Sequence, residues 1–149
     1  MSNQMQSMQQ IEGGRASFAF QEVKKAVDQL GRDSTKVKLY SSYLKRLPSM
    51  IQVNGLGQAM AFYYSKKNKE VQYGLIYKSI SDWIISKSEL PLDHNKEFMD
   101  ALVELNSEPY RRVTAEVMSL LNWMRKFATG MHAELDDNKS GSSDAGTRS

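Results

Sequence analysis

The residues best suited to acid–base or metal chemistry are two histidines, His94 and His132. His94 follows Asp93 directly and precedes Glu97 by three residues, so a small hydrolase built on His94 is one interpretation. A metal would need a third ligand, and a general acid–base pair would need a cleft that shifts pKa values. Solvated surface charge explains most carboxylates in residues 89–108 more simply. The sequence therefore predicts no enzyme: no catalytic residue, no metal site and no cofactor.

Basic residues offer a second kind of chemistry, because cations hold phosphates while aromatic rings stack on bases. Helical spacing places Phe62 and Trp123 among polar and basic neighbours. The predicted outward faces are Lys38, Ser41, Lys45 and Gln52, then Gln58, Phe62, Ser65, Lys66 and Lys69, then Arg112, Glu116, Ser119, Trp123 and Lys126. Packing at the edge of the core is the favoured alternative for both rings. Arg112 and Glu116 have the spacing of an i,i+4 ion pair.

The segment VNGLGQAMAFYYSKK, residues 53–67, places two glycines before an apolar run. A dinucleotide-binding loop would need a preceding strand and a third glycine where Met60 stands, and no Walker motif occurs in the chain. Asn54 and Gly55 are instead residue types that accept the left-handed backbone at a helix end. Gly57 would let the next helix start close to a neighbour. We interpret the segment as a corner between helices, with anion binding at the second helix as the weaker alternative.

Charge is distributed unevenly although the net charge is only +3. Residues 36–78 contain eight basic side chains and one acidic side chain, whereas residues 79–110 contain two basic and seven acidic ones. These blocks predict a bipolar surface. One pole suits a polyanion and the other suits a basic neighbour, although an unevenly charged solvated surface is an equal alternative.

Length and composition favour one ordinary domain of 149 residues. The absence of cysteine excludes disulfides, thiolate metal sites and cysteine nucleophiles, and it favours a cytoplasmic setting. No apolar stretch reaches the ~18 residues of a membrane span. The N-terminal MSNQMQSMQQ is polar and uncharged, unlike a signal peptide.

Apolar residues recur at helical spacing along most of the chain, which predicts an all-α fold, a compact single-domain bundle of about six helices. Gly31 is expected to end the first helix, and Asp33–Thr35 to cap the second. Pro48 is expected to kink or restart that helix. Asp93 is expected to cap a short helix, and Ser107 to open the last one.

The predicted buried faces follow these helices in chain order. They are Ala19, Val23, Ala26, Val27 and Leu30, then Val37, Tyr40, Leu44, Leu47 and Ile51, then Leu56, Ala59, Met60 and Tyr63, then Tyr73, Tyr77, Ile80 and Ile84 with Ile76 and Trp83 beside them, then Phe98, Ala101, Leu102 and Leu105, and finally Val113, Val117, Leu120, Leu121, Met124, Phe127 and Ala128.

The two ends of the chain have a different composition from the middle. Residues 1–14 are predicted to be a flexible extension separated by Gly13 and Gly14, although the spacing of Met1, Met5, Met8 and Ile11 also fits a weak amphipathic helix that docks on a partner. Residues 136–149 are polar and rich in Gly and Ser, so a disordered tail is predicted. The helical domain is expected to span residues 15–135.

Three segments together resemble a known family. RASFAFQEVKKA, LKRLPSMIQVNGLGQAMAFYYSK and YRRVTAEVMSLLNWMRKFATG, within about residues 15–130, resemble the small subunit of type III-B CRISPR–Cas effector complexes, the Cmr small subunit. The more specific parts are NGLGQA and YRR-x-T-x-E leading to LLNW. The positions that match are Asn54, Gly55, Gly57, Gln58, Tyr110, Arg111, Arg112, Thr114, Glu116 and Trp123.

The resemblance implies a small all-helical protein that works without catalysis in antiviral defence. Copies would stack head to tail as a minor filament beside the RAMP-type backbone subunits, contact the large subunit, and help to hold guide RNA and target RNA. A head-to-tail filament needs two different complementary faces, which the two charge blocks offer. The residues expected to contact RNA phosphates are Lys45, Arg46, Lys66, Lys67, Arg111 and Arg112.

A protein–protein adaptor without an RNA role remains the alternative. In that case the basic face would dock an acidic partner, and the contact would survive treatment with RNase.

Overall fold

The structure is a computed structural model in which residues 2–147 are described, with side chains described for residues 10–138. Regular structure within this range is helical throughout, which confirms the predicted all-α fold of six helices. The helices are α1 (Ser2–Gln29), α2 (Ser34–Asn54), α3 (Leu56–Lys66), α4 (Val71–Ser86), α5 (Phe98–Val103) and α6 (Ser107–Thr147).

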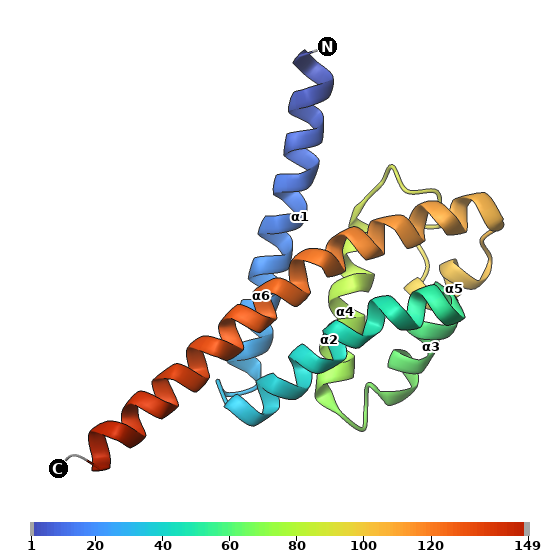
Figure 1. Cartoon of the computed structure of the whole chain (residues 1–149). Coiled ribbons are helices and arrows are strands. Elements are labelled where there is room, and N and C mark those ends of the chain that lie inside the picture. Colours follow the sequence, from blue (N-terminus) through green and yellow to red (C-terminus); the bar gives the residue numbers. More distant parts are fainter. Residues whose placement is uncertain (1, 148–149) are drawn as a thin grey trace.

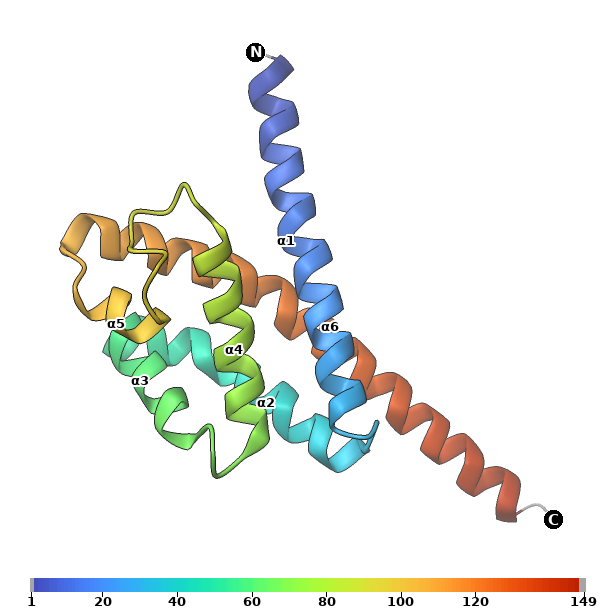
Figure 2. The same cartoon turned by 180° about the vertical axis from the view of Figure 1, so that it is seen from behind.

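Helix α6 is the central element of the bundle (Figure 1). It crosses α1 and runs beside α2, while α3, α4 and α5 complete the domain around its first half. The first part of α1 and the last part of α6 extend away from the bundle in both views (Figures 1 and 2). The packed domain is therefore formed by the middle of the chain.

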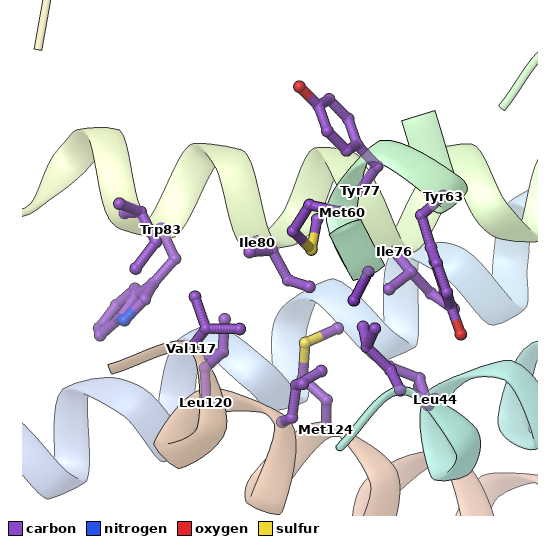
Figure 3. Close-up of a cluster of buried hydrophobic side chains, with 14 of the residues drawn as sticks. Leu44, Met60, Tyr63, Ile76, Tyr77, Ile80, Trp83, Val117, Leu120 and Met124 are labelled. Carbon is purple, nitrogen blue, oxygen red and sulfur yellow. The ribbon is translucent and has the colours of Figure 1, made fainter. Parts of the chain in front are cut away.

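The core lies where α4 faces α6 (Figure 3). Ile80 and Trp83 of α4 point toward Val117 and Leu120 of α6, and Leu44 of α2 closes one side of this cluster. The predicted apolar faces are confirmed: nearly all of their residues are buried, and only Leu105 and Phe127 remain partly exposed. A helical period in the sequence was sufficient to identify this core, because each helix buries one stripe.

The helix boundaries mostly agree with the expected signals. Gly31 adopts a φ of 68° just after α1 ends, and Asp33 caps α2 by accepting a hydrogen bond from the Lys36 amide at 3.1 Å. Helix α6 begins at Ser107 as predicted.

Pro48 lies inside α2, so the helix does not restart there, whereas a kink at Pro48 stays a prediction. Two other local expectations were wrong. Glu97, not Asp93, caps α5 by accepting from the Met99 amide at 2.8 Å, whereas Asp93 accepts from the Asn95 amide within the preceding loop. Ser41 is buried because it lies one turn after buried Val37, on the inner face of α2.

Both ends of the described chain are helical. Helix α1 runs through Gly13 and Gly14 without a break, and α6 continues past Leu135 to Thr147. Ser34 of α2 donates a hydrogen bond to Asp136 of α6, which extends the contact between these helices beyond residue 135. The boundaries at residues 14 and 135 stay predictions, and the side chains of Met5 and Met8 lie outside the described ones.

Candidate nucleic-acid interface

The glycine corner joins the two motifs that carry the family resemblance. Gly55 has a φ of 86°, and its amide donates to the Ile51 carbonyl at 2.8 Å, which closes α2. The Gly57 amide donates to the hydroxyl of Tyr110 at 2.7 Å. Because the Gly57 amide already donates to Tyr110, the N-terminus of α3 has one fewer free amide with which to bind an anion. The prediction of a corner is therefore confirmed.

Lys45 lies in a shallow groove between α2 and α6. The groove is lined by Lys45, Arg125, Lys126 and Thr129, so within the described residues three cations and no carboxylate line it. Arg125 is steadied by a 3.0 Å hydrogen bond from its Nη2 to Asn122. Three exposed cations with aliphatic stems make a surface that attracts an anionic backbone.

Arg46 and Lys66 border an aromatic cluster formed by α2, α3 and α4. Tyr43 stacks on Tyr73 with ring centroids 4.1 Å apart, and Arg46 donates to the Tyr73 hydroxyl at 2.9 Å. Phe62 packs edge-on against Tyr73, and Lys66 lies 5.8 Å from the centre of its ring. Phe62 nevertheless remains 38% exposed. It is thus an edge-of-core residue whose outer face is still open.

The other predicted RNA contacts lie elsewhere. The Lys67 ammonium sits 4.1 Å from the ring centre of Tyr64. Arg111 and Arg112 are exposed on the first turns of α6. The six predicted cations are therefore distributed over four places: the α2–α6 groove, the aromatic cluster, the Tyr64 ring and the start of α6. The structure does not gather them into a single cluster.

Glu116 is not the partner of Arg112. It accepts two hydrogen bonds from Arg15 of α1, at 2.6 and 3.0 Å, and a third from the Trp83 indole at 2.8 Å. Burial opposes ionisation of Glu116, but the hydrogen bonds from Arg15 and Trp83 outweigh it and lower its pKa. The i,i+4 prediction was wrong because α1 crosses α6 here and supplies a better placed arginine.

Trp123 extends the same polar junction. Its indole donates to Glu12 at 2.7 Å, and Glu12 also receives a 2.8 Å hydrogen bond from Arg15. The ring stacks on Phe127 with centroids 5.9 Å apart. Packing against neighbouring residues, the alternative favoured for Trp123, is therefore confirmed.

The histidines are used structurally. The two ring nitrogens of His94 lie 2.7 Å from the Ile85 carbonyl and 2.9 Å from the Leu90 carbonyl. These backbone acceptors, that of Leu90 first, raise the His94 pKa. His132 lies 3.5 Å from Asp136. Among the described residues, no group of three or more His, Asp or Glu side chains is arranged to hold a metal ion.

The sequence reading missed Arg125 as part of a binding surface. The one signal in the sequence was that Arg125 directly precedes Lys126, and helical spacing assigned only Lys126 of this pair to the outward face. Arg15 and Glu12 were missed entirely, since their partners lie about a hundred positions away in the chain.

Fold and surface together define a small helical domain with exposed cationic grooves, and no helix within residues 2–147 is long and apolar enough to cross a membrane. The family model of the CRISPR-associated protein Cas_Cmr5 matches residues 11–131, from α1 into α6. The chain belongs to this family, the small subunits of type III-B Cmr CRISPR effector complexes.

Proposed function

We propose that this chain is the non-catalytic minor-filament subunit of a type III-B effector complex and binds guide and target RNA through phosphate contacts. The observation that carries the proposal is the α2–α6 groove, where Lys45 meets Arg125 and Lys126, in a chain that belongs to the Cas_Cmr5 family. Exposed cations without base-reading geometry suit a sequence-independent backbone contact. Sequence would be read by guide–target pairing, as in other RNA-guided systems.

The remaining predicted contacts are proposed to extend this surface. Lys66 lies beside the ring of Phe62, and Arg46 bonds to Tyr73, against which Phe62 packs. An unpaired base could stack on the open face of Phe62 while these cations hold its phosphate. Lys67, Arg111 and Arg112 are proposed as further phosphate contacts. Copies are proposed to stack head to tail beside RAMP-type backbone subunits in the cytoplasm, with the large subunit as an additional partner.

Charge reversal in the groove tests the RNA contact. The combined variant Lys45→Glu, Arg125→Glu, Lys126→Glu should weaken binding of a guide–target duplex, measured by fluorescence anisotropy, and make the affinity less dependent on salt. Each phosphate contact removed should reduce the slope of log affinity against log salt by about 1. Far-ultraviolet circular dichroism should show an unchanged helical fold, because all three side chains are exposed.

A matched control separates this effect from total charge. Reversal of Lys24, Lys25 and Lys38, which are also exposed but line no part of this groove, changes the net charge by the same amount. If the control weakens binding as much as the groove variant does, the groove assignment is wrong.

An affinity purification tests the cellular role. The tagged chain should recover RAMP-type subunits and short guide RNAs from its host, and RNase should remove the RNA. Recovery of unrelated protein partners that survive RNase would instead support the adaptor alternative.

A further inference from the structure

Helix α4 separates two surfaces of opposite character. At its N-terminal end, a groove is formed with the end of α1 and the first turns of α2. We name it the α4 entry groove, and its lining includes Lys36, Leu39, Lys69 and Val71. At its C-terminal end, a loop of residues 87–97 connects to α5 and carries Glu89, Leu90, Pro91 and Asp93, which we name the acidic tip.

The α4 entry groove combines exposed apolar walls with free cations. Leu39 and Val71 are 41% and 54% exposed, and both line the groove. Lys36 and Lys69 have no ion-pair partner among the described side chains. Glu70 also lines the groove, but its carboxylate accepts a hydrogen bond from Tyr43. Apolar walls favour a protein segment over a bare phosphate backbone as the occupant.

The acidic tip has the complementary arrangement. Leu90 and Pro91 are half-buried at its centre, and exposed Glu89 and Asp93 flank them. The loop's two lysines are already engaged: Lys87 lies 4.0 Å from the Trp83 ring centre, and Lys96 forms an ion pair with Glu104. The tip therefore carries two apolar residues and two carboxylates, and the lining of the groove carries two exposed apolar residues and two lysines.

The loop is held in shape before any partner binds. His94 lies between the Ile85 carbonyl at the end of α4 and the Leu90 carbonyl at the tip, and Leu92 is buried beneath the loop. A segment that is already ordered loses less conformational entropy on docking.

The two surfaces cannot meet within one chain. Helix α4 has 16 residues and is therefore about 24 Å long. Figures 1 and 2 show the loop after α4 at one end of the domain and the α3–α4 turn at the other. A contact between two different surfaces of identical chains is heterologous, and it propagates into an open chain of copies unless the rotation closes a ring.

We infer that the acidic tip of one copy docks into the α4 entry groove of the next, with Glu89 and Asp93 facing Lys36 and Lys69. This inference rests on the proposed head-to-tail stacking and specifies the two faces that make it. The contact is electrostatic at its rim, so it weakens as salt rises.

Cross-linking tests the pairing directly, because the chain contains no cysteine. Leu39→Cys places a thiol in the groove, and Ser88→Cys places one beside the acidic tip. With a short bis-maleimide, a mixture of the two single variants should give cross-linked dimers, and the double variant should give a ladder of higher species. Val53→Cys is the control for Leu39→Cys, since it is 81% exposed at the other end of α2.

Exchanging the charges of the two surfaces is a second test of the pairing. Adding Lys36→Glu and Lys69→Glu to the groove variant should reduce cross-linking about tenfold, and Glu89→Lys with Asp93→Lys on the tip variant should restore it. Equal cross-linking of Val53→Cys, or no rescue by charge exchange, would overturn the inference. So would a lack of cross-linking when the cysteine variants are purified within the assembled complex. If an acidic partner protein or RNA occupies the groove instead, adding it should protect Leu39→Cys from the bis-maleimide while no ladder forms. This result too would overturn the inference.

The outcomes separate the two proposals. If the chain recovers RAMP-type subunits and guide RNA but gives no ladder, the docking inference fails and the proposed function stands. If the ladder forms but no RNA or backbone subunit is recovered, copies pair as inferred and the proposed function fails.

Discussion

The hydroxyl of Tyr110 accepts a hydrogen bond from the amide of Gly57 at 2.7 Å, and it lies 3.0 Å from where a Cβ on Gly55 would be. One side chain at the start of α6 therefore holds the corner between α2 and α3. The two sequence motifs that suggested the family are parts of the same junction. At this junction Tyr110 has a structural role, because its hydroxyl ties the first turn of α6 to the turn between α2 and α3.

The two glycines of the corner should respond differently to substitution. Gly55→Ala should cost about 1–3 kcal/mol, because φ is 86° and the new Cβ would crowd Tyr110. Gly57→Ala should stay within about 1 kcal/mol of the parent, because its Cβ would meet Tyr110 at 3.6 Å and alanine favours a helix. Urea unfolding followed by circular dichroism measures both. Equal losses would show that the corner does not depend on the positive φ.

Arg15 should matter far more than Arg112, although Arg112 is nearer to Glu116 in sequence. Arg15→Ala leaves the Glu116 carboxylate, whose side chain is 13% exposed, with the Trp83 indole as its remaining hydrogen-bond donor among the described residues, so a loss of about 2–4 kcal/mol is expected. Arg112→Ala should change the free energy of unfolding by less than about 0.5 kcal/mol. A large loss of stability in Arg112→Ala, measured in the same unfolding assay, would instead support an ion pair between Arg112 and Glu116.

The stability that Glu116 contributes at this junction should depend on pH. Since the pKa of Glu116 is lowered in the folded state, its contribution to stability is present above its unfolded pKa and is lost as pH falls through its folded pKa. The parent should therefore be more stable than Glu116→Gln at pH 7, and the difference between their unfolding free energies should shrink as the pH falls to 3. Parallel curves for the two proteins would contradict this assignment.

His94 should stabilise the loop of residues 87–97 in its protonated form. Both ring nitrogens face carbonyl oxygens, and only the imidazolium can donate to both. Because the pKa of His94 is raised, the stabilisation is fully present below the unfolded pKa and is lost as pH rises through the folded pKa. His94→Gln should be less stable by about 0.3–1 kcal/mol at pH 5.5, with a smaller difference at pH 8.5. Thermal unfolding at both pH values measures this, and a difference that grows with pH would refute it.

Two buried tyrosines give a matched pair for hydrogen bonding. The Tyr40 hydroxyl is buried and has no hydrogen-bond partner among the described residues, whereas the Tyr63 hydroxyl donates to the Tyr43 carbonyl at 2.6 Å. Tyr40→Phe should be neutral or stabilising by up to about 1 kcal/mol, and Tyr63→Phe should cost about 1 kcal/mol. A loss in Tyr40→Phe equal to that in Tyr63→Phe would indicate a partner for Tyr40, such as a buried water.

Local signals determined much of this fold. Apolar residues at a period of 3.6 identified the buried face of every helix, because a helix that packs on one side must repeat its apolar residues at that period. Gly31, Asp33 and Gly55 marked helix ends, because positive φ and capping are properties of single residues and their immediate neighbours.

Tertiary structure decided which polar residues meet. Arg15 and Glu116 are 101 positions apart, and Lys45 joins Arg125 only because α2 lies beside α6. The sequence by itself determined the helices, their buried faces and the family. The crossing of α1 over α6, and the distribution of the six predicted cations over four places, depended on how whole helices pack, since the free energy of packing is shared among side chains that are distant in the chain.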